Sequence, residues 1–285
     1  MRLENCIVVI GLVVGLLVVG SVMTHAQTWQ PARTLDGQPD LQGIWHNDTW
    51  LSILPALSLE GFDGEHAHIL EEERRVAALP ELKSSRSLII DPADGKIPYL
   101  PWAATERQAF IAHTRTPTEL AHVDPNSRGW PQGVPRLNGY EQLQIVQAPG
   151  YVVFLYAFAH QYRIVPLDGR PHAGSAIKLF NGDARGRWEG NTLVIDTRNL
   201  TDRTRLDHVS FHGVDLHVVE RWTRVAPDRI EFRATLDDST MFSRPWTIAY
   251  SYVPESEGFE LWEEAAYEGE RSVTPTLEGN RRQGK

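Results

Sequence analysis

The chain has 285 residues, a formal net charge of −9 and one cysteine, Cys6. An acidic chain without a basic tract is a poor partner for nucleic acid or for an anionic membrane surface. Because Cys6 lies in a segment that we expect to be removed on export, the mature chain excludes disulfides, cysteine nucleophiles, cysteine-ligated zinc and iron–sulfur clusters.

Residues 1–26 have the pattern of a secretory signal peptide. Arg2 supplies a positive charge, residues 7–19 form an apolar run, and Thr24-His25-Ala26 offers small residues before a cut. The alternative is an uncleaved anchor, but the run is short for a spanning helix of about 20 residues. We therefore expect a periplasmic or secreted protein with residues 27–285 as the mature chain and no membrane span after cleavage.

Residues 27–140 are expected to form an N-terminal arm with short helices packed on the next domain. Residues 41–45 predict a short strand. Apolar and charged residues alternate at helical spacing over residues 64–82, and a second helix is predicted over residues 103–113. Residues 117–140 carry repeated proline and glycine and are too long for an ordinary connection, so we expect a functional loop or a packed arm there.

Residues 141–270 predict an antiparallel β domain, followed by a polar tail over residues 271–285. Short segments rich in β-branched and aromatic residues recur between turn signals, at residues 142–147, 151–157, 162–166, 193–196, 216–225, 229–236, 246–253 and 259–264. Alternation within them indicates one buried and one solvent-facing side. The predicted fold class is mainly β, a lipocalin-like barrel or a sandwich.

A polar hairpin is predicted at residues 183–196. Two strands flank the turn Glu189-Gly190-Asn191, and Arg185, Arg187 and Asp196 lie among them. A short hairpin on a rigid scaffold is a place from which side chains can be aimed at a ligand. We take Arg187, together with Arg170, as a candidate contact for an anionic or carbonyl group of a substrate.

Histidine is the residue type that most clearly indicates a catalytic or metal-binding site. His208 and His212 are four apart and would share one face of a strand, with His217 and Glu220 close behind. Such a set could bind a divalent metal or act as general acid and base. Alternatively, Glu220 could simply pair with Arg221 or with an arginine on the next strand. We name His212, His217 and Glu220 as candidate catalytic residues, assign no metal ligand and leave the cofactor unknown.

A second polar set comprises His160, Arg163, Asp168, Arg170 and His172. Asp168 fits a turn as well as a site, and in a regular strand His160 and Arg163 would point to opposite faces. The chain also has nine tryptophans, which indicate either core packing or an aromatic pocket. The candidate substrate-binding residues are Arg187, Arg170, His160, Trp188 and Trp222.

Several of these segments together resemble a family of secreted, functionally uncharacterised bacterial β-rich proteins. The matching pieces are residues 39–45 (Pro-Asp-Leu-Gln-Gly-Ile-Trp), 144–149, 162–172, 186–197 (Gly-Arg-Trp-Glu-Gly-Asn-Thr-Leu-Val-Ile-Asp-Thr), 211–212, 216–222, 243–246 and 268–269. The resemblance implies a shared fold and no particular reaction. Many members have one cysteine just before the segment that matches residues 131–135 and another within the piece that matches residues 266–269; this chain lacks both. Tyr267 replaces a histidine of the second piece, which puts any role of that histidine in doubt.

The leading hypothesis is an exported small-molecule enzyme that uses histidine and a carboxylate for acid–base chemistry, as a lyase, isomerase or hydratase. A barrel mouth lined with aromatic residues would suit an apolar or aromatic substrate. The alternatives are a non-catalytic periplasmic ligand-binding barrel, a metal-dependent hydrolase and a structural envelope protein. The expected partner of an enzyme or of a ligand-binding barrel is a small molecule.

Overall fold

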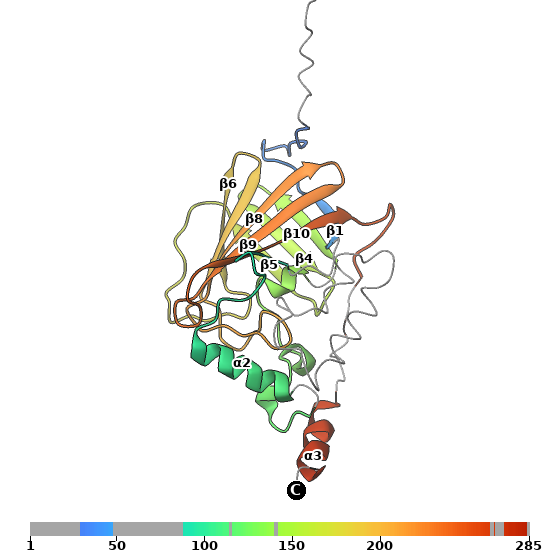
Figure 1. Cartoon of the computed structure of the whole chain (residues 1–285). Helices are drawn as coiled ribbons and strands as arrows, with labels where there is room; N and C mark the ends of the chain where they lie inside the picture. Colours follow the sequence, from blue (N-terminus) through green and yellow to red (C-terminus); the bar gives the residue numbers. More distant parts are fainter. Residues whose placement is uncertain are drawn as a thin grey trace, which may run out of the picture.

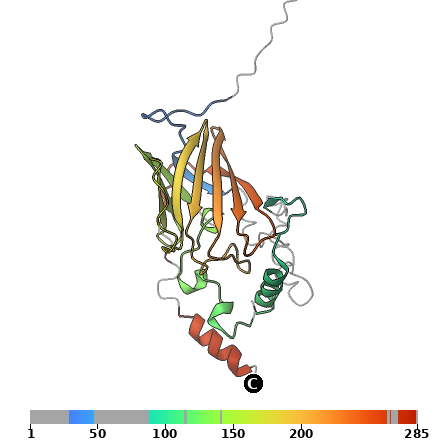
Figure 2. The same cartoon turned by 90° about the vertical axis from the view of Figure 1, so that its left-hand side faces the viewer.

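The computed structural model describes residues 29–47, 88–113, 116–139, 142–262, 265 and 271–283. The predicted signal peptide and the helix predicted over residues 64–82 lie outside these residues. The described part is mainly β, built around one antiparallel sheet that curls into a nearly closed barrel, as Figures 1 and 2 show. This confirms the predicted fold class.

The sheet has ten strands in the order β5-β4-β3-β1-β10-β9-β8-β7-β6, with β2 pairing to β10 beside this path. The strands are β1 (Gly43–Asn47), β2 (Ile89–Asp91), β3 (Leu143–Ala148), β4 (Tyr151–Tyr156), β5 (Tyr162–Pro166), β6 (Asp183–Glu189), β7 (Thr192–Arg198), β8 (His217–Ala226), β9 (Arg229–Asp237) and β10 (Trp246–Pro254). The edge strands β5 and β6 lie close to each other but do not form a ladder of backbone hydrogen bonds, so the barrel is nearly closed at this seam.

The sheet draws on more of the chain than the predicted β domain. Strand β1 comes from the segment expected to be an arm, yet it lies between β3 and β10 and pairs with both. Strand β2, from the same segment, pairs with β10. The described residues of this segment therefore contribute two strands to the barrel sheet. The strand predicted over residues 259–264 is not seen at residues 259–262, which lie outside the regular elements.

Helices gather at one end of the barrel. Helix α2 (Pro101–His113) confirms the helix predicted over residues 103–113, and α3 (Val273–Gln283) forms where we expected a polar tail. Figure 1 shows both helices below the strands. The short 3-10 helices η4 (Leu120–His122), η5 (Asn126–Arg128) and η6 (Arg136–Gly139) belong to the proline- and glycine-rich segment. No helix in the described ranges is long and apolar enough to cross a membrane.

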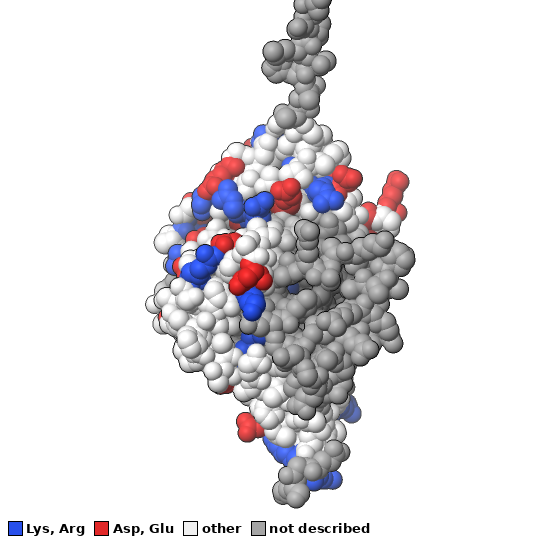
Figure 3. All heavy atoms as spheres, viewed as in Figure 1, with Lys and Arg blue, Asp and Glu red and all other residues white. Residues whose placement is uncertain are grey.

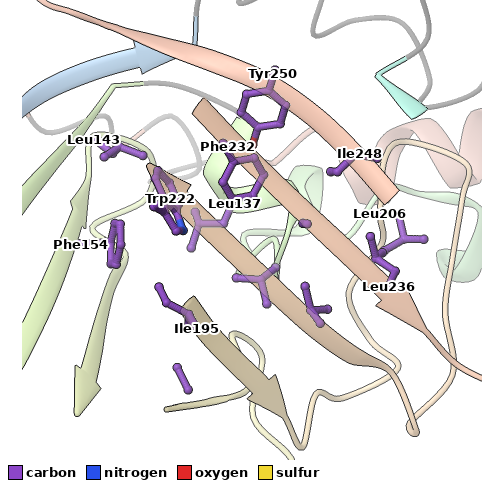
Figure 4. Packing of buried hydrophobic residues seen from close by; sticks show 14 of the residues in the cluster. Leu137, Leu143, Phe154, Ile195, Leu206, Trp222, Phe232, Leu236, Ile248 and Tyr250 are labelled. Atoms are coloured by element: carbon purple, nitrogen blue, oxygen red, sulfur yellow. The ribbon is translucent and has the colours of Figure 1, made fainter. Parts of the chain in front are cut away.

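Inward-facing aromatic side chains fill the middle of the barrel. The ring of Trp222 lies 5.0 Å from that of Phe154, 4.7 Å from that of Phe232 and 5.0 Å from that of Tyr252, centroid to centroid. Figure 4 shows Trp222 packed between Phe154 and Phe232. Strand alternation explains this arrangement, because every second side chain of β4, β8, β9 and β10 points into the barrel.

Candidate functional site

The structure separates the three candidate catalytic residues. His217 and Glu220 are three positions apart in β8, so they face opposite sides of the sheet. Glu220 is fully buried inside the barrel, whereas His217 lies on the outer face and is partly exposed. His212 lies in the loop that precedes β8. The histidine cluster expected from the sequence spacing is therefore not one site.

His212 is fixed inside the loop. Its Nδ1 lies 2.8 Å from the carbonyl oxygen of Gly213 and its Nε2 lies 2.8 Å from the hydroxyl of Thr204. Because a carbonyl only accepts, Nδ1 carries the hydrogen and Nε2 accepts from Thr204. Burial lowers the pKa of His212, which keeps the ring neutral. Both nitrogens are engaged within the protein, so His212 holds the loop together. His208 lies in the same loop and not in a strand.

Glu220 forms a buried ion pair with Arg163. The Nη2 of Arg163 lies 2.5 Å from one carboxylate oxygen of Glu220, and its Nη1 lies 3.0 Å from the other. The amide of Asn138 also donates to Glu220, and Arg163 donates to the hydroxyl of Thr197 at 3.2 Å. Glu220 does pair with an arginine, but the partner is Arg163 of β5 and not Arg221 or an arginine of the next strand. The carboxylate of Glu220 therefore neutralises the buried positive charge of Arg163.

Tyrosine hydroxyls complete the interior polar network. Tyr156 donates to the side-chain oxygen of Asn138 at 2.7 Å, and Tyr252 donates to the carbonyl oxygen of the same residue. The hydroxyl of Tyr250 lies 3.4 Å from that of Tyr252. Burial raises the pKa of each of these tyrosines, so the hydroxyls stay protonated and act as donors. This network joins η6 to β4, β5, β8 and β10.

On the outer face, His217 forms a dyad with Asp196 of β7. Its Nε2 lies 2.9 Å from Oδ2 of Asp196, and its Nδ1 lies 3.4 Å from Nη2 of Arg198. A guanidinium group can only donate hydrogen bonds, so Nδ1 must be the acceptor. The hydrogen of the ring is thereby assigned to Nε2, and Nδ1 presents a lone pair toward Arg198.

His172 joins the dyad from the loop between β5 and β6. Its Nε2 lies 3.0 Å from Oδ1 of Asp196, and its Nδ1 lies 3.1 Å from Oδ2 of Asp183. Asp183 also pairs with Arg185 and accepts from the backbone of Ala173 at 2.8 Å. We call His172, Asp183, Asp196 and His217 the outer cluster. Each of its side chains is less than one-third exposed, between 13% and 25%.

The carboxylates of the outer cluster are held in the ionised form. Burial by itself would raise the pKa of Asp196, but His217, Arg198 and His172 outweigh it and lower the value to about 2. The pKa of Asp183 is also lowered, because the Ala173 amide and Arg185 outweigh its burial. An ionised carboxylate that accepts from Nε2 orients the imidazole and leaves Nδ1 as the basic nitrogen.

The remaining candidate residues do not gather at one site. Arg187 and Glu189 form an exposed network with Arg221 on the outer face, where Figure 3 shows basic and acidic side chains interspersed over the barrel. Arg170 pairs with the neighbouring Asp168, which is the turn residue that the sequence suggested. His160 is exposed in the β4–β5 turn.

Both candidate tryptophans pack on the core. Trp222 is fully buried and surrounded by other rings, and Trp188 is a partly buried residue packed against the same core. The pocket-lining role predicted for Trp222 is therefore replaced by a packing role. The sequence spacing does not connect Asp196 and His172, both members of the outer cluster, with His217. The alternation of β7 is the signal that could have linked Asp196 to His217.

Among the residues that the structure describes, no group of three or more histidine, cysteine, aspartate or glutamate side chains has the geometry to hold a metal ion. No family model, curated protein or solved structure matches the chain.

Proposed function

We propose that this protein is an exported acid–base enzyme of the lyase, isomerase or hydratase type, with its reaction centre at the outer cluster. One observation supports this most directly. Nδ1 of His217 carries a lone pair that faces the exposed guanidinium of Arg198, and the ionised carboxylate of Asp196 orients the ring. A base held by a third group is the arrangement that proton-abstracting and nucleophile-activating sites share.

In the proposed reaction, His217 takes a proton from a carbon next to a carbonyl or carboxyl group of the substrate. The C–H electron pair forms a carbon–carbon double bond, the π pair of the carbonyl moves to its oxygen, and the proton moves to Nδ1. Asp196 balances the imidazolium that forms. Arg198, whose side chain is 51% exposed, would bind the carboxylate or the developing oxyanion. His172 is a positioning residue, because it touches Asp196 and not Nδ1 of His217.

Apolar side chains beside this centre favour an apolar or aromatic substrate. Ile177, Leu179 and Val214 are 52%, 44% and 42% exposed. The backbone of Leu179 bonds to that of Asn199, next to Arg198, and Lys178 donates to the carbonyl oxygen of Val214 at 2.6 Å. These contacts bring the apolar residues to the end of β7 and β8 that carries Arg198 and His217.

A suitable probe is phenylpyruvate, which has an aromatic ring, a carboxylate and an acidic C–H beside a carbonyl. The experiment follows exchange of that hydrogen for deuterium in deuterated water by NMR. We expect catalysed exchange by the wild-type protein and a loss of about 100-fold or more in H217N, which is the usual scale for removing a general base. R198Q should raise KM more than it lowers kcat.

The matched control is H46N. His46 also forms a partly exposed imidazole–carboxylate contact, at 3.0 Å from Glu255, but on β1. We expect this variant to exchange phenylpyruvate at the wild-type rate. Exchange at the rate of buffer alone, or an undiminished rate in H217N, would contradict the proposal. Saturable phenylpyruvate binding without exchange would favour the non-catalytic binding barrel.

A further inference from the structure

Helix α3 is held against the rest of the molecule by few contacts. It is the outermost element at the helical end of the barrel, as Figures 1 and 2 show. Among the side chains that the structure describes in α3, Leu277 alone is buried. The amide of Asn280 donates to the carbonyl oxygen of Pro117 at 3.0 Å, and Nε of Arg281 donates to that of Thr118 at 2.5 Å. The docking of α3 therefore depends on where these two carbonyls lie.

His122 closes the turn that carries the two carbonyls. We call residues 117–122, which end in the 3-10 helix η4, the His122 turn. Nδ1 of His122 lies 3.3 Å from the backbone nitrogen of Thr118 and 3.3 Å from that of Glu119. Because a backbone N–H only donates, Nδ1 accepts both hydrogen bonds and carries no hydrogen itself. A protonated imidazole has a hydrogen on each nitrogen, so these two bonds exist only while the ring of His122 is neutral.

A second histidine ring covers that of His122. His113, the last residue of α2, stacks on it with the ring centroids 4.0 Å apart and an angle of 3° between the planes. Two neutral imidazole rings can pack in this way, whereas two imidazolium ions at the same separation repel each other. The stacked pair therefore adds a second reason for His122 to be neutral when the turn is closed.

The charges around His122 also favour the neutral ring. Burial and His113 lower the pKa of His122, Arg205 from the neighbouring loop adds to the effect, and Glu119 only partly offsets them. Arg281 of α3, which is bonded to the turn, places a further positive charge beside it. The pKa of His122 therefore lies below its ordinary value of 6.5.

We propose that the His122 turn is a pH-sensitive latch for α3. At neutral pH the bare Nδ1 of His122 closes the turn, and the carbonyls of Pro117 and Thr118 hold α3. On acidification, Nδ1 takes up a proton, two backbone N–H groups lose their acceptor, and a positive charge forms against His113. The turn then opens and α3 is released. The latch uses no residue of the outer cluster, so it is independent of the proposed reaction.

The direction of the pH dependence follows from the lowered pKa of His122. The ring has this lowered pKa while α3 is docked and its ordinary pKa once the turn is open, so the docked state binds fewer protons. The docked state therefore keeps its full stability above about pH 6.5 and loses it as the pH falls from there to the lowered pKa.

Hydrogen–deuterium exchange of the full chain, followed by mass spectrometry, tests the latch. Helix α3 has 11 residues, and an isolated helix of this length is marginal in water, so release removes the protection of its backbone amides. We expect peptides from residues 273–283 to be protected at pH 7.5. At pH 5, after correction for the intrinsic pH dependence of exchange, they should exchange about tenfold faster or more, because two hydrogen bonds are lost. Peptides from β8 and β9 should keep their protection.

The variant H122N separates the latch from other effects of acid. Asparagine offers a side-chain oxygen that can accept the two backbone hydrogen bonds, and it takes up no proton in this pH range. We expect α3 of H122N to be as protected at pH 5 as at pH 7.5. The matched control is H160N, because His160 is exposed in the β4–β5 turn, and this variant should release α3 as the wild type does. Equal loss of protection in H122N and the wild type would overturn the proposal, as would a wild-type α3 that stays protected at pH 5.

A second measurement needs no variant and decides the matter if circular dichroism shows that H122N is unfolded. NMR titration of the imidazole of His122 in the wild type gives its pKa, and exchange at several pH values gives the midpoint of α3 release. We expect the two midpoints to coincide below pH 6.5. Titration of His122 without any loss of α3 protection, or release of α3 while His122 stays neutral, would overturn the proposal.

Discussion

At the residue scale, the buried pair of Arg163 and Glu220 is the contact whose loss should cost most. E220Q leaves the Arg163 guanidinium buried opposite a neutral amide. We expect this substitution to lower the free energy of unfolding by about 3 kcal/mol or more, because an uncompensated buried charge remains. Urea denaturation of the wild type and the variant measures the difference.

Two further variants sharpen that experiment. E189Q removes a carboxylate from an exposed network with Arg187 and Arg221 and should leave the unfolding midpoint nearly unchanged. Replacing both partners, in R163M/E220L, should recover much of the stability lost in E220Q, since apolar side chains can fill a buried site without uncompensated charge. An E220Q variant as stable as the wild type would show that the pair does not stabilise the fold.

Asp196 should leave a signature in the acid stability of the protein. Its folded pKa is about 2, below the ordinary 3.8. A carboxyl with a lowered folded pKa contributes stability above its ordinary pKa and loses it as the pH falls toward the folded value. D196N should therefore be less stable than the wild type near neutral pH by about 1 kcal/mol, allowing for partial solvent exposure. Melting temperatures measured between about pH 6 and pH 2 should converge at the acid end. A difference in melting temperature between the wild type and D196N that stays constant over this range would contradict the prediction.

The residue scale is also where the sequence predicted least. Spacing suggested that His212, His217 and Glu220 act together, but the period of two in β8 sends His217 and Glu220 to opposite faces. His217 instead contacts Asp196 of a neighbouring strand, and Asp196 in turn contacts His172 from a loop. Such partners depend on strand register across the sheet, and register is not visible in one strand's sequence.

At the scale of elements, the seam between β5 and β6 rests on a glycine. A Cβ built on Gly186 would lie 2.6 Å from Leu167 and 2.7 Å from Val165. We expect G186A to force these side chains apart and to lower the free energy of unfolding by about 1–3 kcal/mol. The control is G174A, because a Cβ at Gly174 meets no atom within 4 Å. Equal urea midpoints for G186A and the wild type would show that the seam tolerates widening.

Elements with strong local signals were predicted well. The turn Glu189-Gly190-Asn191 joins β6 to β7, and the alternating segments that contain His217 and Arg229 form β8 and β9. The role of β1 was not predictable, because a short strand from a proline-rich segment carries no signal for insertion between β3 and β10. Helix α3 was missed because its residues are mostly polar.

At the scale of the whole molecule, the sheet has one polar network on its inner face and another on its outer face. Arg163, Glu220 and Asn138 form a closed network inside the barrel, and the outer cluster lies on the other side of β7 and β8. Neighbouring residues serve different faces: Asp196 points outward and Thr197 inward. The charges of the interior network are paired with each other, and the chemistry that we propose lies on the outer face.

The most direct test of this account is the tautomer of His217, read from long-range hydrogen–nitrogen NMR correlations of the imidazole near neutral pH. The account predicts a hydrogen on Nε2 and a bare Nδ1, because Asp196 accepts from Nε2 and Arg198 faces Nδ1. D196N should weaken this preference. A hydrogen on Nδ1 in the wild-type protein would remove the base and contradict the proposed chemistry.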